Sequence, residues 1–98
     1  MNTLGLTIHE VDAMRSVLAR HHGVLRAIVY GSRAKGTHRP NSDVDIALDG
    51  DISPLEAESI AGDLDELPLL YRFDVVTIRH ITNEALLEHI KRVGVDLV

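Results

Sequence analysis

The sequence predicts a small α/β (α+β) domain, in which helices pack against a mixed β-sheet. Three apolar, β-branched-rich runs are interspersed with three segments of helical periodicity, in the order helix, strand, strand, helix, strand, helix. Each helical segment follows a Ser, Thr or Asn, which is typical of a helix N-cap. At 98 residues the chain is expected to form one domain, residues 1–98, around one modest core.

The first predicted helix begins after Thr7. Thr7 and Glu10 have the spacing of a capping box. Leu6 precedes the cap, and Val11 stands where it would complete a hydrophobic staple. The apolar stripe of this helix is expected to comprise Ile8, Val11, Met14, Val17 and Leu18. The helix is expected to end near Arg20.

Residues 24–30 are rich in β-branched side chains and bounded by glycines, which predicts a strand. Apolar residues on both of its faces favour an interior position in the sheet. A short helical turn over residues 32–35 is expected to follow.

A loop over residues 36–41, with Pro40 and Asn41 as breakers, leads to the second strand over residues 43–48. A turn is expected at residues 49–51. The loop is too long for a tight hairpin, so the relative direction of the first two strands stays open.

The second helix is predicted to begin after Ser53. Ser53 and Glu56 have capping-box spacing, and Pro54 suits the first helical position. The apolar positions of this helix are Ala57, Ile60, Ala61, Leu64 and Leu67. Pro68 is expected to end it.

Residues 73–78 are expected to form a third strand, with Asp74 on the face opposite Phe73. The last helix is expected after Asn83, with Gly94 as its C-terminal cap. Its apolar positions are Leu86, Leu87, Ile90 and Val93. Residues 95–98 have the composition of a short edge strand. The exposed side of this helix and the tail after it are candidate contact surfaces, because they are apolar.

The composition narrows the classes of function. A net charge of −5 makes the chain a poor candidate for duplex DNA binding, which depends on neutralising phosphates. The basic residues within one heptapeptide instead favour a small anionic ligand: Arg33, Lys35, His38 and Arg39. Cysteine is absent, and neither a signal peptide nor an apolar run of ~20 residues is present, so we expect a cytoplasmic protein without a membrane span.

Two aspartates in the second predicted strand indicate a metal site. Asp43 and Asp45 are two positions apart, so their side chains share one face of the strand. Carboxylates held this close repel each other, and Mg²⁺ prefers such hard oxygen ligands. The nearby Gly31–Ser32 turn offers free backbone N–H groups, which suit a phosphate. Asp74 interrupts an apolar run, where an unpaired charge is costly.

These residues resemble a motif of the nucleotidyltransferase superfamily that includes DNA polymerase beta. In that motif Gly-Ser is followed by about ten residues and then by Asp-x-Asp. Here ten residues separate Gly31-Ser32 from Asp43-Val44-Asp45, and Asp74 corresponds to the third carboxylate of the superfamily. The surrounding sequences Gly-Ser-Arg-Ala-Lys-Gly and Asn-Ser-Asp-Val-Asp are most similar to the minimal nucleotidyltransferases of prokaryotes.

The resemblance implies a polymerase-beta-like fold over residues 8–95 and a magnesium-dependent transfer of a nucleotidyl group from a nucleoside triphosphate, taken to be ATP. Asp43, Asp45 and Asp74 would be the catalytic, metal-binding residues, and Asp74 could also accept the proton of the attacking hydroxyl. Gly31 would allow close backbone approach, and Ser32 would hydrogen-bond a β- or γ-phosphate. Arg33 is expected either to neutralise phosphate or to pair with a carboxylate.

The resemblance also implies a partner. Minimal nucleotidyltransferases typically act with a separate helical protein of the HEPN class, in several cases a ribonuclease toxin that the antitoxin modifies with AMP. We therefore expect an antitoxin that transfers AMP to a HEPN-type toxin. The chain is expected to lack the acceptor-binding domain of larger superfamily members.

Other functions stay open. The same fold could neutralise a helical partner by contact, or bind nucleotide without catalysis. Transfer to a small molecule such as an aminoglycoside would need an acceptor pocket that the sequence does not reveal. The histidines show no zinc spacing. His21 and His22 are expected at helix-terminal carbonyls and His89 on a solvated face, whereas His38 lies in the active loop.

Overall fold

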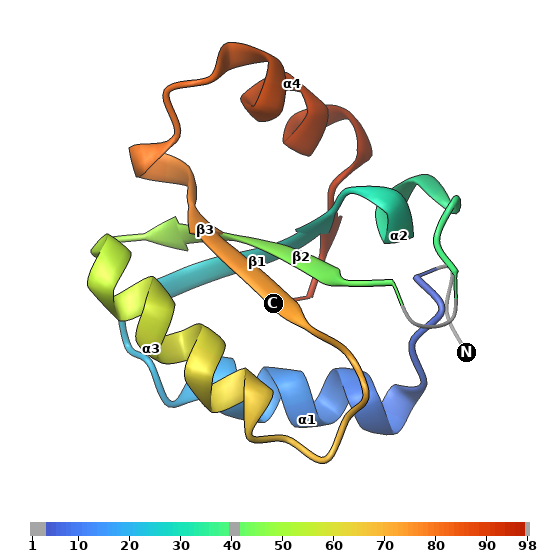
Figure 1. Cartoon of the computed structure of the whole chain (residues 1–98). Coiled ribbons are helices and arrows are strands. Elements are labelled where there is room, and N and C mark those ends of the chain that lie inside the picture. The colour runs from blue at the N-terminus through green and yellow to red at the C-terminus, as the bar shows by residue number, and fades with distance from the viewer. Residues whose placement is uncertain (1–3, 40–41, 98) are drawn as a thin grey trace.

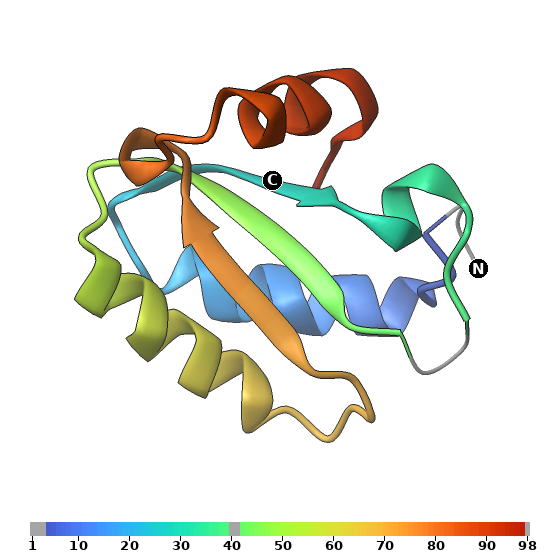
Figure 2. The same ribbon diagram turned by 45° about the horizontal axis from the view of Figure 1, so that its top comes forward.

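Helices lie on both faces of one four-stranded sheet in the computed structural model, which describes residues 4–39 and 42–97. The helices are α1 (Ile8–Ala19), α2 (Ser32–Lys35), α3 (Pro54–Asp65) and α4 (Glu84–Val93), with a 3-10 helix, η1, at Ile78–His80. The strands are β1 (Val24–Tyr30), β2 (Val44–Gly50), β3 (Phe73–Thr77) and β4 (Val95–Asp96). Figures 1 and 2 show α1 and α3 under one face of the sheet and α4 over the other.

The sheet is mixed, as the sequence predicts, and its strand order is β3-β2-β1-β4. β1 is antiparallel to both β2 and β4, whereas β2 and β3 are parallel. The direction of the first two strands, which the sequence leaves open, is therefore antiparallel. β1 is an interior strand, and the parallel connection from β2 to β3 is made through α3.

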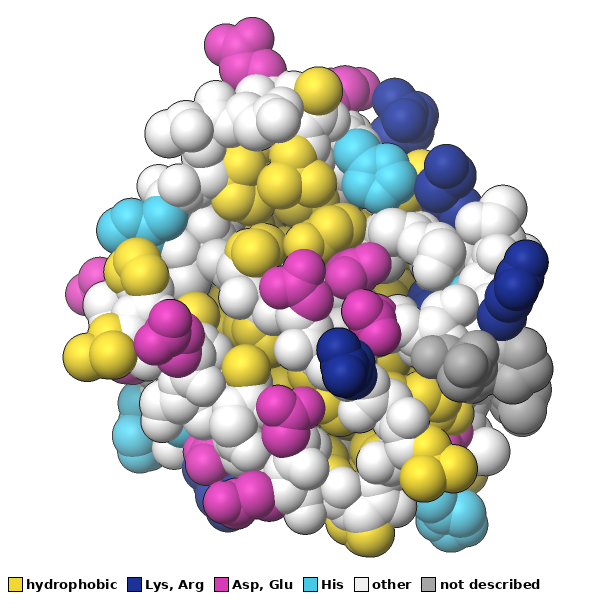
Figure 3. Space-filling model, in the orientation of Figure 1, with side chains coloured by type: hydrophobic (Ala, Val, Ile, Leu, Met, Phe, Trp, Pro, Cys, Tyr) yellow, Lys and Arg dark blue, Asp and Glu magenta, His cyan; other side chains and the backbone are white. Residues whose placement is uncertain are grey.

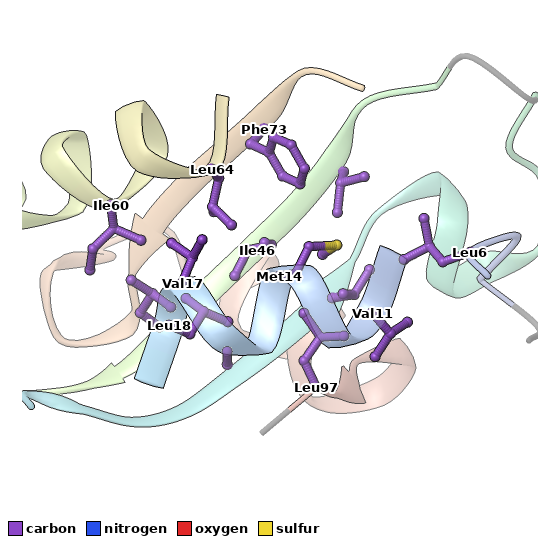
Figure 4. Close-up of a cluster of buried hydrophobic side chains, with 14 of the residues drawn as sticks. Leu6, Val11, Met14, Val17, Leu18, Ile46, Ile60, Leu64, Phe73 and Leu97 are labelled. Carbon is purple, nitrogen blue, oxygen red and sulfur yellow. The ribbon is translucent and has the colours of Figure 1, made fainter. Parts of the chain in front are cut away.

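The larger core fills the space between the sheet and the two helices α1 and α3 (Figure 4). Val44, Ile46 and Leu48 of β2 are fully buried there. Their alternation confirms that the residues between them, including Asp45, point to the opposite face. A smaller cluster on that opposite face joins α4 to the sheet through Ile90.

Helix caps account for where the helices begin. The Thr7 hydroxyl accepts a hydrogen bond from the Glu10 N–H at 3.1 Å, and the Glu10 carboxylate accepts one from the Thr7 N–H at 2.8 Å, so the predicted capping box is confirmed. Ser53 accepts from the Glu56 N–H, although the described contacts contain no return bond. Asn83 caps α4 in the same way.

The predicted stripe of α1 is wrong at one position. Ile8 is 71% exposed, whereas Val11, Met14, Val17 and Leu18 are buried. Leu6, which precedes the cap, is fully buried and packs in the same cluster as Val11. It fills the place beside the first turn of the helix, so Ile8 is left at the edge of the stripe.

Several boundaries differ from prediction. Asp49 and Gly50 belong to β2 because Val24 of β1 pairs with Gly50 and extends the ladder. α3 ends at Asp65, before Pro68, and Ile78 belongs to η1.

At the C-terminal end, Gly94 does cap α4, but its φ of −61° is ordinary rather than left-handed. The predicted edge strand is confirmed over Val95–Asp96, and Val98 lies outside the described residues, as do Pro40 and Asn41. In the described ranges no helix has the length and apolarity that a bilayer crossing requires.

Candidate active site

One row of side chains crosses three adjacent strands on the face of the sheet that carries α4. Tyr30 of β1 pairs with Asp45 of β2, and Asp45 pairs with Asp74 of β3. Paired residues on neighbouring strands are about 5 Å apart and point to the same face. The carboxylates of Asp45 and Asp74 are therefore neighbours. Figure 3 shows acidic side chains gathered near the middle of the view, below the region of α4.

Asp43 immediately precedes β2 and completes the acidic cluster. Burial raises the pKa of Asp45, and the negative charges of Asp74 and Asp43 raise it further. Burial also raises the pKa of Tyr30 to about 12, with added effects from Asp45 and Asp74. The structure thus places Asp43 and Asp74, the other two carboxylates that the sequence singled out, close enough to Asp45 to disfavour its ionised form.

The donor chemistry of this cluster fits Mg²⁺. Within residues 4–39 and 42–97, no three His, Cys, Asp or Glu side chains are arranged to hold a metal ion by themselves. Mg²⁺ usually needs only one or two carboxylates, and takes its other ligands from water and substrate phosphates. Asp45 is half-buried and Asp43 and Asp74 are exposed, so these neighbouring carboxylates are a suitable partial shell, which a nucleotide would complete.

The Gly31–Ser32 turn lies directly against Asp45. Gly31 has φ +76°, and a Cβ at this position would collide with the Asp45 Oδ2. Only glycine allows both this backbone conformation and this approach. Ser32 begins α2, its side chain is half-buried, and its hydroxyl makes no hydrogen bond within the described part of the chain. The hydroxyl is thus available to a ligand beside the carboxylates.

Arg33 is placed differently from its neighbours in the motif. Its side chain is 1% exposed, and its guanidinium donates to the carbonyls of Leu4 (2.8 Å) and Ser42 (2.9 Å). It also stacks over the Tyr71 ring, 4.5 Å from the centroid. These described contacts join the N-terminal segment to the end of the loop, and none of them is with Asp43, Asp45 or Asp74. Lys35 is exposed.

His89 is a residue of this region that the sequence prediction missed. The prediction of a solvated position is wrong, because the His89 ring is half-buried. Its Nε2 accepts a hydrogen bond from the Gly31 N–H at 3.1 Å, and its ring meets Tyr30 edge to face. In its protonated form the imidazole lowers the pKa of Asp45, against the effect of burial. Helical spacing could have revealed it, since His89 lies three residues after Leu86 and precedes Ile90.

The described contacts of His21 and His38 are with residues outside the acidic cluster. His21 bonds to Asp63 at 2.9 Å and not to helix-terminal carbonyls, because α3 brings this carboxylate to the end of α1. The His38 ring lies against Gly5, and its buried Nδ1 has no hydrogen-bond partner among the described residues.

A hollow of about 320 Å³ lies on the same face of the sheet, and none of the three carboxylates lines it. Its residues are Arg26, Ile28, Asp49, Ile78, Leu87, Ile90, Lys91, Gly94 and Asp96. The acidic cluster lies outside this hollow, and two of its members, Asp43 and Asp74, are exposed to solvent.

A mixed sheet with a Gly-Ser turn against an Asp-x-Asp strand and a third carboxylate alongside defines the nucleotidyltransferase class of domain. The family model for polymerase beta nucleotidyltransferases matches residues 13–98. The chain therefore belongs to the polymerase beta nucleotidyltransferase family. Among curated proteins, no significant match is found.

Solved structures with the same fold include several toxin–antitoxin complexes. The chain matches a toxin–antitoxin structure with AMP-PNP at TM-score 0.76 and 22% identity, covering 90% of this chain and 72% of that chain. It matches an MntA–HepT complex at TM-score 0.73 and 18% identity, over 94% and 72% of the two chains. A third match is the complex of tri-AMPylated Shewanella oneidensis HEPN toxin with MNT antitoxin (TM-score 0.71, 17% identity, 92% and 70% coverage). At these identities the likeness shows the fold alone.

Proposed function

We propose that this chain is a Mg²⁺-dependent nucleotidyltransferase that moves AMP from ATP to a hydroxyl group of a HEPN-type protein, and thereby acts as an antitoxin. The observation that carries the proposal is the pairing of Asp45 with Asp74 beside the Gly31–Ser32 turn. Membership of the family supports the class of reaction. The structures with AMP-PNP and with an AMPylated HEPN toxin support the choice of nucleotide and acceptor.

In the proposed reaction the acceptor hydroxyl attacks the α-phosphorus of ATP. A new oxygen–phosphorus bond forms, the bond to the β-phosphate oxygen breaks, and pyrophosphate leaves. Bound Mg²⁺ supplies neutralisation of the phosphate charge. Asp43 and Asp45 hold the metal, and Asp74 completes its site and accepts the proton of the attacking hydroxyl.

Ser32 has the complementary role of binding phosphate. Its hydroxyl and its N–H donate to a β- or γ-phosphate, which fixes the triphosphate beside the carboxylates. Arg33 contributes indirectly, because its contacts with Leu4 and Ser42 hold the loop that leads into Asp43.

The partner contacts the exposed side of α4 and the segment that follows it. The exposed side of α4 carries Glu88, Lys91 and Arg92, contrary to the prediction that it is apolar, so a partner there makes mainly polar contacts, with the 36% exposed Val95 of β4 beside them. A partner bound there covers the same face of the sheet that carries the carboxylates, so its hydroxyl can approach them.

Transfer of radiolabel tests the proposal. The chain is incubated with ATP labelled at the α-phosphate, Mg²⁺ and its co-purified partner. We expect label on the partner, and a loss of at least about 100-fold in transfer for Asp43→Asn and for Asp45→Asn. Asp49→Asn is the matched control, since Asp49 is on the same strand and face but outside the acidic cluster. It should transfer label at the wild-type rate.

Two outcomes contradict the proposal. If either cluster variant keeps near-wild-type turnover with Mg²⁺, the carboxylates do not have the proposed role. If the chain forms a tight complex with its partner but transfers no label, it acts by contact as a binding module.

A further inference from the structure

His89 connects α4 to the turn at which the triphosphate is proposed to bind. Ile90 is 4% exposed in the small cluster, and Leu86 packs against the same cluster. These contacts fix the inner face of α4 on the sheet. His89 lies on that face and reaches the start of the Gly31–Ser32 turn.

The hydrogen bond between the two elements fixes the protonation state of the ring. The Gly31 N–H is the donor, so the His89 Nε2 must carry a lone pair and the ring proton belongs on Nδ1. The edge-to-face contact with Tyr30, with centroids 6.1 Å apart and planes at 82°, limits rotation of the imidazole.

Gly31 links His89 both to the Asp45 carboxylate and to Ser32. Its N–H is held by His89, and its Cα lies against the Asp45 carboxylate. The next residue, Ser32, begins α2. A change at His89 therefore shifts the turn relative to Asp45, and it also shifts the Ser32 hydroxyl.

We propose that His89 is a positioning residue for nucleotidyl transfer, whose neutral imidazole holds the Gly31 N–H and so sets Ser32 at the triphosphate. The inference rests on the proposed function, because it concerns the phosphate-binding half of the same site. His89 touches the turn and not the reacting atoms, so its effect falls mainly on the binding of ATP.

Paired variants separate the hydrogen bond from the ring contact. His89→Gln keeps an acceptor on a side chain of similar reach, whereas His89→Phe keeps the ring against Tyr30 and loses the acceptor. We expect His89→Phe to raise KM for ATP about tenfold, with kcat at saturating ATP changed less than about threefold. His89→Gln should stay within about threefold of wild type. Glu88→Gln, at an exposed position of the same helix, is the control.

A spectroscopic measurement on the wild-type chain tests the geometry without any variant. Nitrogen-15 NMR of the imidazole should show the proton on Nδ1 and an unprotonated, hydrogen-bonded Nε2 near neutral pH. A proton on Nε2 overturns the inference. Urea unfolding of each variant establishes that it is folded under the assay conditions.

The outcomes distinguish this inference from the proposed function. If wild type transfers label and folded His89→Phe has the wild-type KM, the inference is overturned and the proposed function stands. If wild type transfers no label although Nε2 accepts the hydrogen bond, the proposed function has failed, and with it the role of His89 in transfer.

Discussion

At Asp45, a half-buried carboxylate lies among groups that make its charge unfavourable. Burial, Asp74 and Asp43 all raise its pKa, and only the protonated form of His89 opposes them. Like charges held together in a binding site lower the stability of the folded protein. A cation that binds between them, alone or with a phosphate, offsets this repulsion.

This arrangement predicts a pH-dependent stability. A raised pKa in the folded state means that folding disfavours the ionised form, so the contribution of Asp45 to stability falls as the pH rises from about 4 through the folded-state pKa. Asp45→Asn should therefore raise the free energy of unfolding at pH 7. Solvent screening of this half-exposed group limits the gain to about 0.5 kcal/mol.

Urea unfolding as a function of pH measures this effect. The gain of Asp45→Asn should vanish below about pH 4, where wild-type Asp45 is protonated in both states. Saturating Mg²⁺ with a non-hydrolysable ATP analogue should stabilise wild type more than the variant. The electrostatic account is contradicted if Asp45→Asn is less stable than wild type, and by the same amount at pH 7 as at low pH.

The burial of Arg33 predicts that its replacement lowers the stability of the fold substantially. Its buried guanidinium satisfies the carbonyls of Leu4 and Ser42. Arg33→Met leaves those carbonyls without this donor and should reduce the free energy of unfolding by about 2–4 kcal/mol, measured by urea unfolding. Lys35→Met, an exposed substitution on the same short helix, should stay within about 0.5 kcal/mol.

The competing interpretation of Arg33 gives the opposite pattern. A phosphate-binding role would make Arg33→Met lose affinity for ATP while its stability stayed near that of wild type. Calorimetric titration with the non-hydrolysable analogue, at a temperature where the variant is folded, separates the two.

At the scale of the elements, the C-terminal end of α4 packs closely against β1. A Cβ on Gly94 would collide with the carbonyl oxygen of Ile90 and with the Ile28 side chain of β1. The backbone of Gly94 has an ordinary φ, so space rather than conformation requires glycine here. This contact sets how closely the helix that carries His89 can approach the sheet.

Two glycine substitutions should therefore have opposite signs. Gly94→Ala is expected to destabilise the fold by about 1–3 kcal/mol, because α4 or β1 must shift to make room. Gly62→Ala lies within α3, where a Cβ would meet no atom within 4 Å, and should stabilise by about 0.5–1 kcal/mol. Thermal unfolding of both variants measures the difference, and equal effects would contradict the packing assigned to Gly94.

Local signals in the sequence predicted most elements but not their lateral register. Thr7, Ser53 and Asn83 located the helix starts because caps act within one turn. The pairing of Asp45 with Asp74 depends on how α3 returns the chain to the sheet, which no local pattern determines. The partners of Arg33 are likewise distant in sequence, so its burial could not be predicted.

At the scale of the whole molecule, the two faces of the sheet have different roles. α1 and α3 bury the larger core on one face. α4 covers only part of the other, and the acidic cluster lies beside it in the open (Figure 3). Alternation in β2 predicted that Asp45 points away from the buried Val44 and Ile46, whereas Asp74 was assigned to the cluster from the family resemblance. The sequence did not predict His89, because a histidine within an apolar stripe is easily assigned to solvent.

The central claim is that the three carboxylates and the Gly31–Ser32 turn form one metal–nucleotide site. An amide NMR spectrum recorded with a non-hydrolysable ATP analogue and substoichiometric Mn²⁺ tests it most directly, since the paramagnetic ion broadens nearby signals. The account predicts that the signals of residues 31–32, 43–45 and 74 disappear first, and that Asp45→Asn prevents this. Broadening centred elsewhere, or unchanged in Asp45→Asn, would contradict it.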